Sequence, residues 1–309
     1  MCVHHNAKNR NQIRNAATSI LGKQQKLTMT PYTIAVSQCA LFRQETGYID
    51  PGDAFPFVKA LTMVNQRLSE LGPAIKERFK IVLIPTNSQD MDPLKNSIEN
   101  HNLNIDQICE ITGKKTLLDH LNEIKPVLYL STTPQNVKDA INEGFGAATL
   151  LKGDYDKHSD EGLRVAFDGD GVLFSDDSEK VTKEKGLEAF FQNEIENEDT
   201  PLKLGPLRDF FKALAHLQEL FKKEKKNSPI RTYLVTSRAT SSPGIRALKS
   251  LRENNLEINE AFFLSGAHKG PVLKAFKPHI FFDDYMQHVK EALHYGVIGA
   301  HVPYGVRNE

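Results

Sequence analysis

The sequence predicts an α/β fold built from two fused lobes, each containing a parallel sheet. From Thr33 onward, short apolar runs alternate with amphipathic stretches, which is typical of strand–helix–strand units. The pattern then starts again, with matching segments about 152–153 residues further along the chain. Because this period is as long as a domain, it indicates an internal duplication and not a solenoid.

The first copy contains three expected strands that alternate with three expected helices. The runs assigned to strands are Thr33–Phe42, Lys80–Ile84 and Val127–Leu130. The stretches assigned to helices are Phe55–Leu71, the segment around Asn96–His101, and Val137–Glu143. The strands are almost continuously apolar, as expected where helices cover both faces of a sheet.

The second copy matches the first in several segments that follow the same order. The matched pairs are Phe57–Leu61 with Phe210–Leu214, Ser97–Ile105 with Ser250–Ile258, and Val137–Ala140 with Val289–Ala292. The segment Lys152–Gly162 is polar and rich in turn formers, as expected of a linker. We therefore expect a first lobe at residues 31–155 and a second lobe at residues 160–309.

The composition excludes several functional classes. The 309 residues include 39 Lys and Arg against 39 Asp and Glu, so the zero net charge argues against a strongly basic nucleic-acid binder. No apolar run approaches the roughly 20 residues that span a bilayer. The three cysteines have neither disulfide nor zinc-site spacing, and their number suits a reducing cytosol. We expect a cytoplasmic protein with no nucleic-acid or membrane partner; the sequence leaves open whether it forms a homo-oligomer.

The first 30 residues are polar and lack the apolar core of a signal peptide. Ile13, Ala17 and Ile20 could line one face of a short helix, or the segment could be loosely docked. We expect residues 1–30 to form a flexible or helical N-terminal arm.

Two carboxylates follow the first expected strand of the second copy. Asp168 and Asp170 come directly after Arg164–Phe167, and adjacent glycines let the backbone approach a ligand. Ligands of open α/β sheets bind at the carboxyl ends of strands, and two close acids need a cation or a shared proton. A turn without chemistry is the alternative. A calcium loop is excluded because Val172 stands where a third oxygen ligand is needed.

Three further features favour a phosphate and cation site. Thr236 follows the strand Thr232–Val235 and could donate to a phosphate oxygen, although it could equally be a helix N-cap. Lys269 precedes a helical stretch and could supply a point charge for phosphate, or be an ordinary solvated lysine. Asp283 and Asp284 follow a fully apolar run and indicate either a cation site or a turn.

These features resemble the four motifs of the haloacid dehalogenase (HAD) superfamily. In order along the chain, the motifs are two acids separated by one residue at a strand end, a hydroxyl residue at a strand end, a lysine, and a final pair of acids. Longer strings are similar to the cytosolic 5′-nucleotidase type I family. They are Phe167–Asp170, Arg231–Arg238, Ser265–Pro271, His279–Asp284, His301–Gly305 and, in the first copy, Pro51–Lys59. The resemblance covers about residues 31–306. It implies two Rossmann-like (HAD-like) lobes, with a small helical cap inserted at about residues 175–205.

The resemblance also implies a Mg²⁺-dependent 5′-nucleotidase that hydrolyses a nucleoside monophosphate, with AMP as the usual substrate, through an aspartyl-phosphate. Asp168 would be the nucleophile, and Asp170 the general acid and then the base. Thr236 and Lys269 would hold the phosphoryl group, with Ser237 and Arg238 as further substrate-binding residues. The implied Mg²⁺ site consists of Asp168, the backbone carbonyl of Asp170, and Asp283, Asp284 or both.

The first copy has lost the acids of these motifs. Ser37 and Cys39 align with the acid–x–acid pair of the second copy, and Ser131-Thr132 aligns with the final acid pair. Thr86 and Asn87 could bind nucleoside atoms without a metal ion, which would make the first lobe a lid or a substrate-recognition lobe. Alternatively, the first copy only completes the fold.

The expected cap includes the acidic and lysine-rich segment Ser175–Pro201, whose charges we expect to form a solvated helix face. Phe190 and Phe191 would pack within the protein or provide a platform for adenine. Two positions depart mildly from the family pattern. A slightly bulkier residue would also be ordinary at position 171, where this chain has Gly171, and a proline would be familiar at position 268, where it has His268. Two other functions stay open: a phosphatase of the same chemistry for another small phosphomonoester, and a non-catalytic nucleotide-binding regulator.

Overall fold

The computed structural model describes residues 31–45, 48–85, 91–109, 115–155 and 162–308. The expected N-terminal arm, residues 1–30, lies outside the described residues, and so do Thr86 and Asn87. Within the described ranges, no helix is long and apolar enough to cross a membrane.

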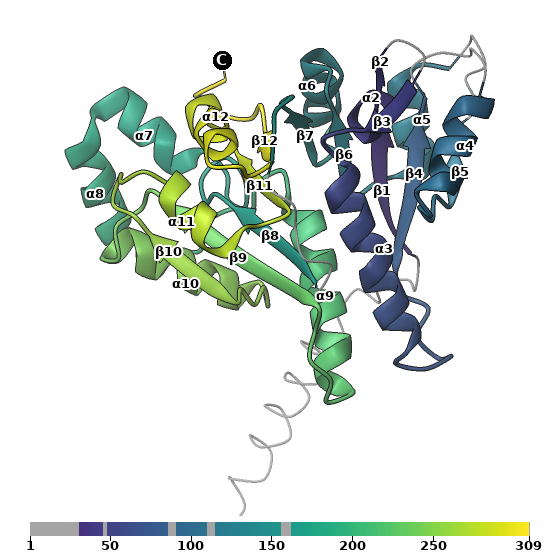
Figure 1. Cartoon of the computed structure of the whole chain (residues 1–309). Helices are drawn as coiled ribbons and strands as arrows, with labels where there is room; N and C mark the ends of the chain where they lie inside the picture. Colours follow the sequence, from purple (N-terminus) through teal and green to yellow (C-terminus); the bar gives the residue numbers. More distant parts are fainter. Residues whose placement is uncertain (1–30, 46–47, 86–90, 110–114, 156–161, 309) are drawn as a thin grey trace, which may run out of the picture. The chain divides into compact units, whose positions relative to one another are not determined.

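A ten-stranded sheet forms the centre of the described part of the chain (Figure 1). Its first-half strands are β1 (Tyr32–Ser37), β4 (Phe79–Ile84), β5 (Gln107–Ile108), β6 (Leu128–Ser131) and β7 (Ala147–Leu150). Its second-half strands are β8 (Leu163–Phe167), β9 (Ile230–Thr236), β10 (Glu260–Phe263), β11 (Ile280–Asp283) and β12 (Gly299–His301). The strand order is β10-β9-β8-β11-β12-β7-β6-β1-β4-β5. All neighbours pair parallel except β12 and β7, which confirms the predicted α/β class with a largely parallel sheet.

The two halves of the sheet repeat one strand order, β5-β4-β1-β6-β7 in the first half and β10-β9-β8-β11-β12 in the second. The sequence predicts two sheets, but the structure joins them into one through the pairing of β7 with β12. Because this pairing is antiparallel, the strands of the two halves run in opposite directions. The carboxyl ends of the two sets of strands therefore lie at opposite edges of the sheet.

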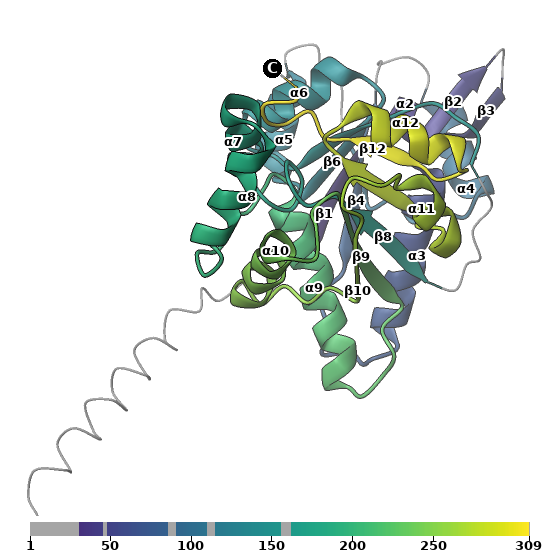
Figure 2. The same cartoon turned by 90° about the vertical axis from the view of Figure 1, so that its left-hand side faces the viewer.

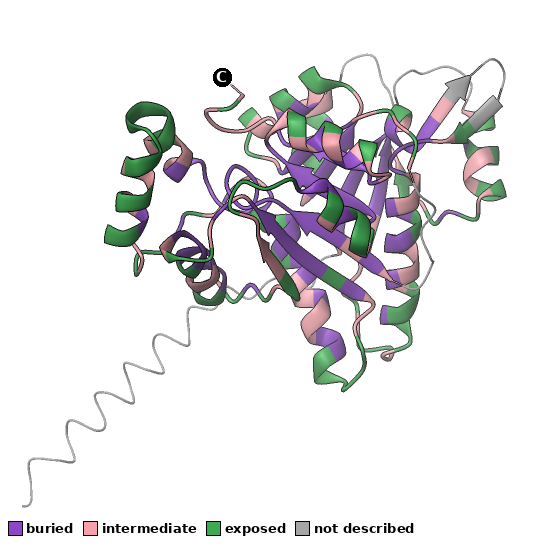
Figure 3. Ribbon diagram, turned by 60° about the vertical axis from the view of Figure 1, so that its left-hand side comes forward, coloured by how far each residue is buried: buried purple, intermediate pink, exposed green. Residues whose placement is uncertain are grey.

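Helices cover both faces of the sheet (Figures 2 and 3). They are α3 (Phe55–Ser69), α4 (Asp92–Asn100), α5 (Leu117–Ile124) and α6 (Pro134–Asn142) in the first half, and α9 (Arg208–Lys223), α10 (Ser242–Glu253), α11 (Gly270–Phe276) and α12 (Met286–His294) in the second. Successive side chains of a strand point to opposite faces. Phe167 of β8 thus contacts Phe211 of α9, whereas Ala166 belongs to a second cluster with Leu273 of α11 and Ala292 of α12. Burial on both faces explains why the strands are apolar throughout.

Equivalent helices of the two halves contact each other. Phe57 of α3 and Phe210 of α9 are fully buried, and their ring centroids lie 6.1 Å apart in an edge-to-face arrangement. These residues begin the matched segments Phe57–Leu61 and Phe210–Leu214. The two halves therefore share one hydrophobic core, which lies on the α3 and α9 face of the sheet.

The first predicted strand is shorter than expected. We predicted a strand over Thr33–Phe42, but β1 ends at Ser37 and is followed by the short helix α2 (Gln38–Leu41). The prediction is wrong beyond Ser37 because Ala40 and Leu41 reach the core from a helical turn and not from an extended chain. An antiparallel hairpin, β2 (Phe42–Glu45) and β3 (Tyr48–Pro51), then leads to α3.

Two helices, α7 (Asp177–Lys185) and α8 (Leu187–Glu196), lie between β8 and α9, in the segment where the sequence places a cap. They form a pair that stands out at one side of the second half, and α8 packs against α10 (Figure 1).

Candidate active site

The chain turns tightly after β8 and places acidic side chains at the carboxyl end of this strand. Asp168 is buried, and its backbone N–H donates to the carbonyl oxygen of Phe282 in β11 (2.8 Å). Gly171 has a φ of +73°, and a Cβ atom at this position would lie 2.6 Å from Cγ of Asp284. The bulkier residue that the family resemblance allows at position 171 therefore does not fit this turn.

A buried lysine connects the acids of two strand ends. The Lys269 side chain has no exposed surface, and Nζ lies 2.8 Å from Oδ1 of Asp168 and 2.7 Å from Oδ2 of Asp283. Burial lowers the pKa of Lys269, but these two carboxylates raise it overall, so the ammonium stays charged. The alternative that Lys269 is an ordinary solvated lysine is excluded.

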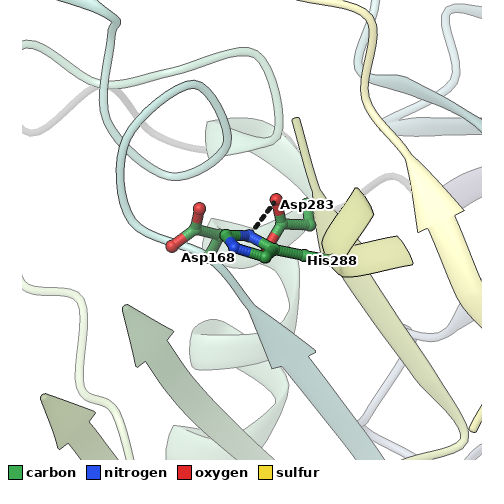
Figure 4. A group of neighbouring side chains, drawn as sticks. All are labelled: Asp168, Asp283 and His288. Carbon is green, nitrogen blue, oxygen red and sulfur yellow. Dashed lines mark hydrogen bonds and ion pairs between the residues drawn. The ribbon is translucent and has the colours of Figure 1, made fainter. Parts of the chain in front are cut away.

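Asp283 is compensated on several sides. Besides Lys269, its carboxylate accepts the backbone N–H of Tyr285 (2.8 Å) and lies 3.1 Å from Nδ1 of His288. Burial raises the pKa of Asp283, but Lys269 and His288 lower it overall. Ligand atoms of Asp168, Asp283 and His288 lie within 4.8 Å of one another, so this group could hold a metal ion (Figure 4).

Asp284 lacks such compensation. Both of its carboxylate oxygens are buried, and neither has a hydrogen-bond partner within the described ranges; Nε of Arg307 lies 4.0 Å from Oδ2. Burial, and to a lesser extent the negative charge of Glu179, raise the pKa of Asp284 to about 10. Burial also raises the pKa of Glu179 to about 7 and that of Asp168 to about 6. The charged form of Asp284 is thus the least compensated of these acids, and a cation bound beside it would stabilise that form.

A buried arginine holds Asp170 in place. Arg238 is 4% exposed, and its guanidinium donates to both carboxylate oxygens of Asp170 (2.7 and 2.8 Å). Arg238 also pairs with Glu194 of α8, which in turn pairs with Arg246 of α10 (2.8 Å). The expectation that the cap charges are solvated is wrong for Glu194, which is fully buried because two arginines compensate for its charge. The structure therefore ties the predicted substrate-binding residue Arg238 to Asp170.

A cavity of about 300 Å³ opens beside these groups. The predicted residues that line it are Asp168, Asp170, Thr236, Ser237 and Arg238. The apolar side chains that line it are Leu187, Phe190 and Phe191 of α8, together with Ala239. Every described residue at this cavity belongs to the second half of the chain. The cavity thus combines charged residues at the strand ends with an apolar surface from α8.

Three residues of this site were not assigned roles from the sequence: Glu179, His288 and Arg307. Arg307, near the end of the chain, pairs with Glu179 of α7 (2.7 Å). This contact joins residues far apart in sequence, so no local pattern could have predicted it. His288 lies in the first turn of α12, shortly after Asp283 at the end of β11, and a search for histidines just beyond a strand-end acid would have found it.

Comparison with known proteins identifies the family. The sequence pattern of the family described as 5′-nucleotidase matches residues 34–309. The chain belongs to the 5′-nucleotidase family. It is 44% identical over 295 residues to cytosolic 5′-nucleotidase 1B from Homo sapiens, an alignment that covers 87% of this chain and 48% of the human protein. The chain thus spans about half the length of this relative. These findings confirm the 5′-nucleotidase resemblance predicted from the motifs.

Two solved structures resemble this 5′-nucleotidase family member distantly. A protein from Listeria monocytogenes described as a UDP-N-acetylglucosamine 2-epimerase matches with a TM-score of 0.22 and 11% identity. MnaA from S. aureus in a structure with UDP matches with a TM-score of 0.20 and 10% identity. Each alignment covers 87% of this chain and 78% of the other. At such scores the likeness carries no argument about fold or function.

Proposed function

We propose that this member of the 5′-nucleotidase family hydrolyses nucleoside 5′-monophosphates, with AMP as the expected substrate, in a Mg²⁺-dependent reaction through an aspartyl-phosphate. The observation that carries the proposal is the 2.8 Å ion pair between Asp168 and the fully buried Lys269, beside a cavity that Thr236 and Ser237 also line. Phosphoryl transfer depends mainly on positioning and charge neutralisation, and this arrangement supports both.

The environments of the acids favour one set of metal-holding residues. Asp283 is already compensated by a lysine and a histidine, whereas both oxygens of Asp284 are buried without a partner within the described ranges. Mg²⁺ prefers one or two carboxylates, with phosphate and water oxygens completing its shell. Asp168, the backbone carbonyl of Asp170 and Asp284 would therefore hold Mg²⁺, and Asp283 would position Lys269. When bound, Mg²⁺ would neutralise charge on the transferred phosphoryl group.

The side chains at the strand ends account for both steps of the reaction. A carboxylate oxygen of Asp168 attacks phosphorus while the bond to the ribose 5′ oxygen breaks, and Asp170 donates a proton to that oxygen. Asp170 then accepts a proton from water, whose oxygen attacks phosphorus of the aspartyl-phosphate and releases inorganic phosphate. Lys269 and Thr236 hold the phosphoryl oxygens during both steps. Arg238 keeps the Asp170 carboxylate in a fixed orientation, and one of its two hydrogen bonds to Asp170 would open when that carboxyl group carries the proton it donates.

The apolar surface of α8 supports a nucleoside as the leaving group. Phe190 and Phe191 line the cavity and contact each other edge to face, with ring centroids 5.4 Å apart. Leu187 and Phe191 are 62% and 38% exposed, so they are available to a ligand. A planar base can stack on such side chains, whereas a small sugar phosphate would leave them uncovered.

The repeated strand order supports an internal duplication in which residues 160–309 form the catalytic HAD-like domain, with α7 and α8 as its cap, and residues 31–155 form the degenerate copy. The role of the first lobe as a lid or recognition lobe stays a prediction, because Thr86 and Asn87 lie outside the described residues. The cytoplasmic location is likewise a prediction.

Measurement of phosphate release, in Mg²⁺ or in EDTA, tests the proposal. The substrates are AMP, dAMP, IMP, GMP, CMP, UMP and sugar phosphates. We expect Mg²⁺-dependent release from nucleotides that Asp168→Asn abolishes. Asp209→Asn is the matched control, since Asp209 is an exposed acid in α9. Release from sugar phosphates alone would keep the mechanism and reject the substrate. Nucleotide binding without any release would reject the enzymatic function.

A further inference from the structure

A second cavity, of about 230 Å³, lies in the first half of the chain. Its lining includes Ser37 at the end of β1, Ile84 at the end of β4 and Ser131 at the end of β6. These strands occupy the positions that β8, β9 and β11 occupy in the second half. The cavity therefore lies where the repeated strand order places the equivalent of the candidate active site, at the point where ligands of open α/β sheets bind.

The residue changes between the two sites remove the acids: serines replace Asp168 and Asp283, and Cys39 replaces Asp170. Ser131 ends β6 as Asp283 ends β11, and Ser37 stands where Asp168 stands after β8. The local backbone is the same, because Oγ of Ser131 accepts the N–H of Thr133 (3.1 Å) just as Asp283 accepts the N–H two residues further on. The first half has thus kept the geometry of the site while losing its negative charge.

One buried hydroxyl group of this cavity lacks a partner. Oγ of Ser37 is buried and has no hydrogen-bond partner within the described ranges, and Ser37 is 8% exposed. Tyr129 has no exposed surface; burial raises the pKa of its hydroxyl, and hydrogen bonding to Ser131 and Asn136 partly offsets this effect. A buried hydroxyl without a hydrogen bond is costly, so Ser37 favours a polar ligand in the cavity.

The charge of the cavity favours an anion. None of the described residues that line it is acidic, whereas Lys115 is among them. Lys115 also pairs with the exposed Glu123 (2.6 Å), and its 43% exposed side chain has freedom to turn toward a ligand. Helix α6 begins at the same place, and the side chain of its N-cap residue, Thr133, makes no capping hydrogen bond. Hydroxyl donors, a lysine and a helix N-terminus are groups that bind phosphate.

We propose that the first half binds the phosphate group of a small anion, either inorganic phosphate or a small phosphomonoester, in this cavity and without a metal ion. A metal ion is not required, because no acid of the described lining repels the phosphate. The cavity also lacks a carboxylate nucleophile within the described lining, so binding there leads to no hydrolysis. The proposal does not depend on nucleotidase activity.

Binding of radiolabelled inorganic phosphate by equilibrium dialysis in EDTA tests this proposal. We expect saturable binding to the wild-type protein with a Kd of about 1 mM or tighter. Ser131→Asp restores the acid of the other half and should weaken binding at least about tenfold through charge repulsion. Lys115→Glu, at an exposed position, should do the same without changing a buried residue. Asp209→Asn, at an exposed acid outside both cavities, is the control and should leave binding in EDTA unchanged. Thr236→Ala tests whether the second-half cavity contributes to the measured binding.

Two outcomes would overturn the proposal. One is the absence of saturable phosphate binding in EDTA. The other is binding that Thr236→Ala removes and Lys115→Glu leaves unchanged, which would place the anion in the second half. Competition by ribose 5-phosphate distinguishes the two candidate ligands, inorganic phosphate and a small phosphomonoester. If ribose 5-phosphate binds more tightly than inorganic phosphate, the cavity is a phosphomonoester site. Melting curves of each variant separate lost binding from lost folding.

Discussion

Asp283 and Asp284 are adjacent in sequence but differ in their surroundings, and this difference predicts separate effects of mutation. Asp284→Asn should raise the Mg²⁺ concentration for half-maximal activity by about tenfold or more, because it removes a carboxylate that would hold the ion. Its melting temperature in EDTA should rise at neutral pH, because a pKa of about 10 means that folding the wild-type protein requires this acid to take up a proton, which Asn avoids. Asp283→Asn should instead lower kcat, because Lys269 loses one of its two carboxylate partners. Mg²⁺ titrations of both variants check this assignment, and a larger Mg²⁺ shift in Asp283→Asn would contradict it.

Gly171 provides a second test at the scale of single residues. Gly171→Ala would place a Cβ atom 2.6 Å from Cγ of Asp284 in a backbone with φ of +73°, so both the turn and the acid must move. We expect a loss of about 1–3 kcal/mol in unfolding free energy together with weaker Mg²⁺ activation. Gly186→Ala is the matched control, because Gly186 has a φ of +86° but no atom within 4 Å of the Cβ that alanine would add. Gly186→Ala should lose stability only; equal Mg²⁺ effects in both variants would contradict the role of Asp284.

At the scale of elements, one buried glutamate anchors the outer helix α8 to the rest of the second half. Glu194 pairs with Arg238, which holds Asp170, and with Arg246 of α10. Glu194→Gln should therefore cost about 3–5 kcal/mol of unfolding free energy, because it leaves buried arginine charge uncompensated. It should also lower kcat, since Arg238 loses a partner that orients it.

Glu196→Gln on the same helix is the control for this prediction. Glu196 is exposed and has only a hydrogen bond with Gln192, so its replacement should change stability by less than about 0.5 kcal/mol. Denaturant unfolding and AMP hydrolysis measure both effects. If Glu194→Gln unfolds like the control, the ion-pair network is not the anchor of α8.

The elements also show which parts of the structure the sequence can predict. The strands that end at Ile84, Phe167 and Asp283 were predicted to within a residue or two, since continuous apolar runs are specific to strands buried on both faces. The site residues at strand ends and helix starts were predicted for the same reason. The ion pair of Glu179 with Arg307 and the burial of Glu194 were not predicted, because tertiary packing of distant segments determines them. The joining of the two sheets through β7 and β12 depends on backbone pairing at strand edges, which leaves no mark in the apolar pattern.

For the described part of the molecule as a whole, the antiparallel joint between β7 and β12 separates the two strand-end sites. The acidic site of the second half and the hydroxyl-lined cavity of the first half lie at opposite edges of one sheet and share no lining residue. The two halves thus contain one site with excess negative charge and one without it.

We expect the excess negative charge to make the stability of the protein depend on both pH and Mg²⁺. Burial raises the pKa of Asp168 to about 6, of Glu179 to about 7 and of Asp284 to about 10. Without metal, the folded protein keeps these protons at pH values where the unfolded chain has lost them. Because proton binding and folding are thermodynamically linked, the contribution of these acids to the unfolding free energy must fall as the pH rises from about 4 toward their folded-state pKa values. Asp283 has a lowered pKa and stays ionised over this range, so it does not offset the trend.

Bound Mg²⁺ should reverse this trend, because ions that bind carboxylates favour their ionised forms and displace protons. We expect the unfolding free energy in EDTA to fall by at least about 1 kcal/mol between about pH 5 and pH 8, and the stabilisation by Mg²⁺ to grow over the same interval. Chemical denaturation across this range, with and without Mg²⁺ at constant ionic strength, measures both quantities. Asp284→Asn should lose most of the Mg²⁺ effect while keeping part of the fall in EDTA, since Asp168 and Glu179 still titrate. A Mg²⁺ effect that is equal at both pH values would show that these acids do not hold the ion.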